Sequence, residues 1–155
     1  MAIAHPIPET ALRITRTFRA SREKVFRAWT EPEALKRWFA PDDAYDTQVL
    51  LFDPRPGGRY RVDMRKEDGS HIVAGEYREV RPPEKLVFTW KWENHPERGT
   101  EDTIVTLEFF DRGESTELVL THERFPNAAS RDNHNKGWSG CLDRLGRYIL
   151  ERSAS

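Results

Sequence analysis

Two histidines of this 155-residue chain are the side chains best suited to moving a proton. His122 follows Leu118 and Leu120 at alternate positions, in the inward phase of a predicted strand, and His134 lies four residues before Trp138 on the apolar face of a predicted helix. Because the pKa of an imidazole is near neutrality, two of them beside a cavity can act as acid and base. The interpretation we favour is that both are core histidines bonded to a backbone carbonyl or a carboxylate.

Arg16 is a third polar candidate, because it lies in the apolar phase of the first predicted strand. A buried guanidinium needs a partner, since leaving its charge unpaired is costly. The side chain could hold a carboxylate or hydroxyl of a ligand. The favoured interpretation is an internal salt bridge with a strand glutamate such as Glu108 or Glu123.

A group of aromatic and soft side chains could form the wall of a pocket for a flat or lipophilic ligand. Its members are Trp38, Tyr60, Met64, Tyr77, Trp90, Trp92 and Trp138. For any one of them, plain core packing is the simpler interpretation. Together with Arg16, His122 and His134 they are the ligand-binding residues predicted from the sequence.

The sequence predicts neither a metal site nor a cofactor. His122, His134 and Cys141 stand at no recognised ligand spacing, and the motifs HExxH and CxxC are absent. Cys141 is the only cysteine, which excludes a disulfide within the chain. It falls in the apolar sector of the last helix, so we expect it to pack as a small hydrophobe.

The elements that must position these residues follow from the apolar spacing and the turn signals. The spacing predicts a strand over 12–18, helices over 21–29 and 30–39, strands over 45–52, 59–65, 71–80, 86–92, 103–110 and 116–123, and a helix over 128–151. Ser21 is expected to cap the first helix, and Thr30-Glu31-Pro32-Glu33 fits a capping box for the second. Asp68-Gly69 predicts a hairpin turn, and 94–100 a polar loop.

This order of elements is typical of an α+β fold with one antiparallel sheet of seven strands. The last helix is the only element long enough to cover the apolar face of that sheet, and Trp138, Leu142, Leu145 and Ile149 give it one apolar side. A strongly twisted sheet curled around one helix cannot close tightly everywhere. The pattern therefore predicts a cavity between helix and sheet.

Composition limits the class of protein. The formal net charge of −1 argues against general binding of nucleic acid. No apolar run approaches the roughly 18 residues of a membrane span, and no signal peptide is visible, so we predict no membrane contact and a cytoplasmic location. The length predicts a single domain over 11–152, after a flexible N-terminal arm over 1–10.

Several segments share their pattern with a known family. They are ITRTFRASREKVFRAWTEPEALKRWFAP (14–41), GEYREVRPPEKLVFTW (75–90), LTHERF (120–125) and HNKGWSGCLDRLGRYI (134–149). In order and spacing they resemble the START-like, or SRPBCC, superfamily, and in particular the branch named after the activator of the 90-kilodalton heat-shock-protein ATPase. The resemblance covers about residues 11–150. It implies a helix-grip fold, in which a seven-stranded antiparallel sheet grips a long C-terminal helix around a hydrophobic pocket.

Three functions remain open at this point. The first is binding of a small hydrophobic or aromatic molecule between sheet and helix, oriented by Arg16, Tyr60, His122 and His134. The second is an enzyme of the polyketide cyclase, dehydratase or hydrolase kind that uses the same cavity. The third is a chaperone-associated protein, which the branch name suggests. It is disfavoured because the eukaryotic activators carry an additional N-terminal domain for which 155 residues leave no space. A homodimer through exposed edge strands is possible.

Overall fold

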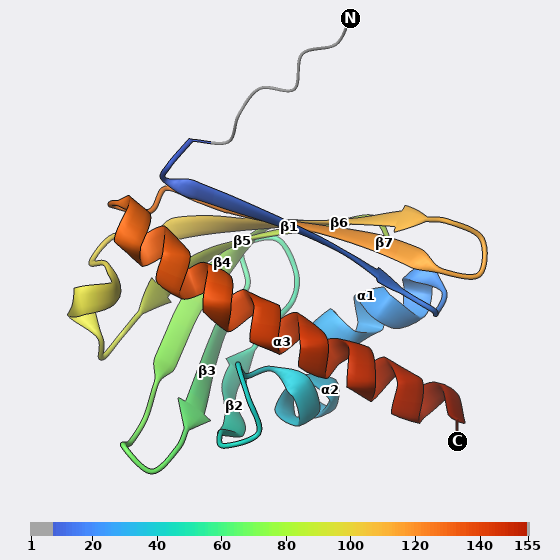
Figure 1. Ribbon diagram of the computed structural model, residues 1–155, viewed down its shortest axis with the longest axis horizontal. Helices are drawn as coiled ribbons and strands as arrows, with labels where there is room; N and C mark the ends of the chain where they lie inside the picture. The colour runs from blue at the N-terminus through green and yellow to red at the C-terminus, as the bar shows by residue number, and fades with distance from the viewer. Residues whose placement is uncertain (1–7, 155) are drawn as a thin grey trace, which may run out of the picture.

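A computed structural model describes residues 8–154 and has the predicted α+β architecture (Figure 1). The elements are β1 (Ala11–Phe18), α1 (Arg22–Thr30), α2 (Pro32–Trp38), β2 (Asp46–Phe52), β3 (Arg59–Arg65), β4 (Ile72–Arg81), β5 (Lys85–Trp92), the 3-10 turn η1 (Pro96–Arg98), β6 (Thr103–Asp111), β7 (Thr116–Glu123) and α3 (Ala128–Ala154). The order of elements and the helix-grip fold are as predicted. The predicted N-terminal arm covers residues 1–10, and residues 1–7 of it lie outside the described part of the chain.

The seven strands form one antiparallel sheet in the order β1-β7-β6-β5-β4-β3-β2. The register shifts between Val49 and Leu51 on β2 and between Tyr77 and Glu79 on β4. Such bulges bend the strand that carries them and increase its twist. The sheet therefore curls, and α3 lies across its concave face (Figure 1).

The two short helices begin differently from each other. The Ser21 hydroxyl accepts a hydrogen bond from the backbone N–H of Lys24, at 3.3 Å, so the predicted cap of α1 is confirmed. The predicted capping box of α2 is wrong. Thr30 is the last residue of α1, and its hydroxyl donates to the carbonyl of Phe26; Glu31 precedes α2 without a side-chain cap. The β-hydroxyl bonds back into its own helix, so it cannot serve the next one.

The long helix α3 is fixed against the loop that follows α2. A β-carbon at Gly140 would overlap the backbone carbonyl of Pro41, so only glycine allows this approach. The Arg144 guanidinium donates to the carbonyls of Arg37 and Trp38 at the end of α2, both at 3.3 Å. These contacts fix the middle of α3 against the end of α2 and the loop that follows it.

Aromatic side chains fill the space between the helices and the centre of the sheet. The centroids of Trp29 and Trp38 are 4.7 Å apart, those of Trp38 and Phe39 5.4 Å, and those of Trp90 and Trp138 4.9 Å. The Trp38 indole N–H donates to the carbonyl of Ala28 at 2.9 Å. Of these rings, Trp90 and Trp138 also border the space that remains beside the first turns of α3.

Candidate functional site

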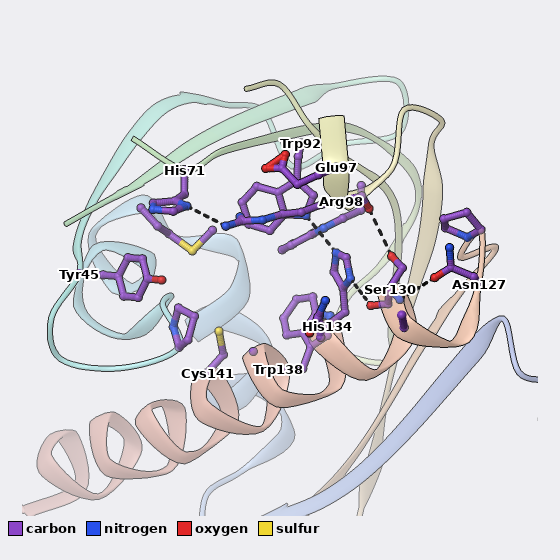
Figure 2. Close-up of a pocket in the computed structure, with 17 residues that line it drawn as sticks. Tyr45, His71, Trp92, Glu97, Arg98, Asn127, Ser130, His134, Trp138 and Cys141 are labelled. Atoms are coloured by element: carbon purple, nitrogen blue, oxygen red, sulfur yellow. Dashed lines mark hydrogen bonds between the residues drawn. The ribbon is translucent and has the colours of Figure 1, made fainter. Parts of the chain in front are cut away.

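A cavity of about 490 Å³ lies between the N-terminal half of α3 and the sheet (Figure 2). The helix and the residues before it contribute Pro126, Asn127, Ala129, Ser130, Asn133, His134, Gly137, Trp138 and Cys141. The sheet contributes Met64, His71, Trp90 and Trp92, and the loops contribute Pro41, Tyr45, Glu97 and Arg98. The volume falls in the usual range of small-molecule sites, roughly 300–1,000 Å³.

The helical wall follows from the spacing of residues along α3. Ser130, His134, Gly137, Trp138 and Cys141 recur at three- and four-residue intervals, so they share one side of the helix. Gly137 leaves that side open, because a β-carbon there would have no atom within 4 Å. A larger side chain at 137 would therefore extend into free space beside the cavity.

The sheet wall consists mainly of the indole rings of β5. Trp90 and Trp92 stand edge to face with a centroid separation of 5.6 Å. The Trp90 indole N–H is buried and has no hydrogen-bond partner among residues 8–154, whereas that of Trp92 is bonded to a histidine. A buried donor without a partner is costly, and such groups are uncommon in proteins.

His122 is completely buried behind this wall. Its Nδ1 accepts from the Trp138 indole N–H at 3.0 Å, and its Nε2 lies 2.6 Å from the Thr103 hydroxyl. An indole nitrogen can only donate, so Nδ1 carries no proton and Nε2 donates to Thr103. The Thr103 hydroxyl in turn donates to the carbonyl of Trp90 at 2.9 Å. Both ring nitrogens of His122 are thus bonded to protein groups.

Like His122, His134 accepts from an indole N–H through one ring nitrogen and donates through the other, but the two nitrogens have exchanged roles. Its Nε2 accepts from the Trp92 indole N–H at 3.0 Å, and its Nδ1 donates to the carbonyl of Ser130 at 2.7 Å. Burial lowers the pKa of His134 and, more strongly, that of His122, whose pKa the neighbouring His134 depresses further. Neither histidine offers a free ring nitrogen to the cavity, so the acid–base hypothesis loses the two residues on which it was based.

A third histidine faces the cavity with a different set of partners. His71 Nδ1 accepts from Arg98 Nη2 at 3.0 Å, and its Nε2 lies 2.9 Å from Asp68 Oδ1. Since an arginine can only donate, Nε2 carries the proton toward Asp68. This hydrogen bond lowers the pKa of the Asp68 carboxyl. The ring of His71 also stacks on that of His95, with centroids 4.6 Å apart.

The ten predicted ligand-binding residues divide into five that line the cavity, four that lie in the core and one that lies elsewhere. Met64, Trp90, Trp92, His134 and Trp138 line the cavity. Trp38, Tyr60, Tyr77 and His122 are buried in the core beside it, and the Tyr60 hydroxyl donates to the carbonyl of Thr89. The remaining one, Arg16, lies on β1 away from the cavity. Its guanidinium pairs with Asp143 of α3 at 2.6 Å, not with Glu108 or Glu123. The helix that crosses β1 supplies the nearer carboxylate.

The sequence interpretation missed Tyr45, His71, Arg98 and the polar residues that begin α3. His71 carried a usable signal, because it is in the same strand phase as Val73 and Tyr77. The predicted hairpin precedes it, but its turn is shifted by one residue: Lys66 pairs with Gly69, so the central residues are Glu67 and Asp68 and not Asp68 and Gly69. Arg98 carried no such signal. It lies in the predicted polar loop, which contains the turn η1, and a turn has no apolar period.

Cys141 lines the cavity as a buried thiol, and burial raises its pKa to about 12. Among residues 8–154 no group of three or more histidine, cysteine or acidic side chains is placed to hold a metal ion. Within the same part of the chain, no helix has both the length and the apolar composition of a membrane span.

Comparison with known proteins gives a consistent result. The family model of the Activator of Hsp90 ATPase homolog 1-like proteins matches residues 19–149. The human Activator of 90 kDa heat shock protein ATPase homolog 1 is 27% identical over 145 residues, which cover 94% of this chain and 36% of the human protein. The chain thus spans about a third of the length of that relative.

Solved structures have the same fold. Protein CV1439 from Chromobacterium violaceum superposes with a TM-score of 0.81 at 27% identity, over 90% of this chain and 96% of that one. The AHSA1 (SPO3351) protein from Silicibacter pomeroyi superposes with a TM-score of 0.80 at 23% identity, over 92% of this chain and 99% of that one. The second likeness supports the fold alone.

Proposed function

This chain belongs to the family of Activator of Hsp90 ATPase homolog 1-like proteins, and within it we propose that the chain binds a small hydrophobic or aromatic molecule in the cavity beside α3. The observation that carries the proposal is the cavity of about 490 Å³ with indole rings on two walls. Burial of apolar surface would supply most of the affinity, at about 25 cal/mol for each Å² of apolar surface that the ligand and the cavity remove from water. The polar groups on the loops and at the start of α3 would orient the ligand.

Binding without catalysis fits the histidines better than the enzyme alternative does. A general base needs a nitrogen within reach of the substrate, and the nitrogens of His122 and His134 are all bonded to protein groups. The buried thiol of Cys141 is also a poor nucleophile, because its pKa of about 12 keeps it protonated. An enzyme of the cyclase, dehydratase or hydrolase kind would have to use other groups.

Native mass spectrometry of freshly purified protein tests the proposal without assuming the ligand. We expect the wild-type protein to carry an added mass that denaturing conditions remove. The variant Gly137→Leu, which places a side chain beside the cavity, should lose that mass, while Gly146→Ala farther along α3 should keep it. Ligand-free spectra for the wild-type protein, or the same added mass in Gly137→Leu, would contradict the proposal.

Contact with a chaperone is a second candidate, favoured by the match to the human activator over 94% of this chain. Because that match spans 36% of the human protein, the activity in its name is a hypothesis for this chain. Co-precipitation of a purified 90-kilodalton chaperone with this domain would support it, and no retention of the chaperone would dismiss it.

The cytoplasmic location and the homodimer stay predictions. Size-exclusion chromatography with light scattering tests whether the protein forms a dimer.

A further inference from the structure

One cation on the cavity wall is held by uncharged groups. The Arg98 guanidinium lies over the Trp92 ring, with 4.4 Å from its central carbon to the ring centroid, and donates through Nη2 to Nδ1 of His71. Figure 2 shows Arg98 alongside Trp92, between His71 and the first turns of α3. The ring face and the imidazole lone pair fix the orientation of the guanidinium without neutralising its charge.

The nearby carboxylates make their hydrogen bonds with histidines, although the charge of Arg98 also contributes to the lowered pKa of Glu97. Glu97, the one acidic residue on the lining formed by the described residues, bonds to Nδ1 of His95 at 2.9 Å, and this contact is the main cause of its lowered pKa. Asp68 lies on the far side of the His71 ring, bonded to Nε2. Among residues 8–154 no carboxylate forms an ion pair with Arg98. The half-buried guanidinium therefore keeps a positive charge and free N–H groups for another partner.

The surfaces next to Arg98 favour a flat partner. Trp90, Trp92 and Trp138 form adjoining walls, and the phenol ring of Tyr45 lies across the cavity (Figure 2). Indole faces pack against planar rings, and a guanidinium fork matches a carboxylate in two parallel hydrogen bonds. A single ligand can satisfy both features if it carries an acidic group on an aromatic ring.

We infer that the cavity selects anionic aromatic molecules, with Arg98 as the residue that binds the carboxylate or an equivalent anionic group. This inference rests on the proposed function and narrows its ligand class. His71 is a positioning residue in this account, because it holds Nη2 of Arg98 in place. When a ligand binds, Nη2 of Arg98 can leave the uncharged imidazole of His71 at little electrostatic cost. Leaving a carboxylate partner would cost much more, because an attraction between opposite charges would be lost.

The test compares two probes of one shape and different charge, 2-naphthoate and 2-naphthamide, by titration calorimetry. We expect the wild-type protein to bind the naphthoate about tenfold to a hundredfold more tightly, as a charged hydrogen bond implies. Arg98→Gln should abolish the preference for naphthoate over the amide, so that the ratio of the two affinities falls to about one. Arg98→Lys should recover part of the preference, and Arg59→Gln, at the end of β3 remote from Met64, should leave it intact.

The outcomes separate the two proposals. If neither probe binds, the proposed function fails and this inference fails with it. If both probes bind the wild-type protein equally, the cavity is a binding site but the inference about charge is wrong. If Arg98→Gln keeps the full preference for naphthoate, the role of Arg98 is wrong. Circular dichroism checks that the variants are folded. If Arg98→Gln does not fold, the comparison of Arg98→Lys with the wild-type protein still tests the role of Arg98.

Discussion

The indole N–H of Trp138 in α3 donates to Nδ1 of His122 in β7 at 3.0 Å, joining the long helix to the sheet through a hydrogen bond between two buried side chains. The bond fixes His122 as the tautomer that donates through Nε2 to Thr103. The pair of histidines that most resembled catalytic machinery in the sequence is therefore part of the support of the cavity wall.

Stability should fall as the pH drops below about 6.5. The folded protein keeps His122 and His134 neutral and lowers their pKa values, while in the unfolded chain each titrates near 6.5. Below that pH the unfolded state binds protons that the folded state does not, so stability is full above 6.5 and declines toward the folded pKa values. The slope approaches about 1.4 kcal/mol per pH unit for each histidine.

Urea unfolding at pH 7.5, 6.5 and 5.5 measures this slope. His134→Gln should make it shallower, and Asn135→Ala, an exposed neighbour on α3, should not. The carboxyls whose pKa values are lowered, Asp43, Asp68 and Glu97, titrate below this window and do not contribute. An unchanged slope in His134→Gln would show that this histidine is not buried as a neutral group.

The three glycines of α3 should respond differently to alanine. Gly137→Ala meets open space and Gly146→Ala meets the Phe18 ring at 3.6 Å, an ordinary contact, so each should gain up to about 1 kcal/mol of stability from helix propensity. Gly140→Ala should lose roughly 1–3 kcal/mol, because its methyl group would overlap the carbonyl of Pro41. Thermal denaturation of the three variants measures the order. A stabilised Gly140→Ala would mean that α3 does not approach the loop after α2 this closely.

Cys141 should react slowly with iodoacetamide in the folded protein. With a pKa of about 12, the thiolate fraction at pH 8 is about a thousandfold smaller than that of an ordinary thiol with a pKa of about 8.5. Mass spectrometry of timed samples gives the rate, and the same protein in urea is the reference. Equal rates with and without urea would contradict the buried environment of this side chain.

The sequence was sufficient for the fold because periodicity reports which face of an element is buried. Trp138, Leu142 and Leu145 defined the apolar side of α3, and the alternation in β7 placed His122 inward, as found. Periodicity does not report how far an inward side chain lies from a gap in the packing. Trp38 and Tyr77 are therefore in the core, while Trp90 and Trp92, with the same inward signal, reach the cavity.

The polar side of the cavity depends on contacts between distant segments. Arg98 meets His71 across 27 positions of the chain, and Arg16 meets Asp143 across 127. Nothing in the local pattern around either arginine identifies its partner, because the pairing is set by where the β5–β6 connection and α3 lie in the fold. A sequence interpretation can predict that each arginine needs a partner but not which residue supplies it.

The most direct test of the central claim is a fluorescence titration with the uncharged probe N-phenyl-1-naphthylamine, whose emission rises when it leaves water. The wild-type protein and Gly146→Ala should bind it saturably at one site, and Gly137→Leu should bind it at least about tenfold more weakly while remaining folded, because the added side chain occupies space beside the cavity. Absence of saturable binding by the wild-type protein, or equal binding by Gly137→Leu, would contradict the assignment of this cavity as a ligand-binding site.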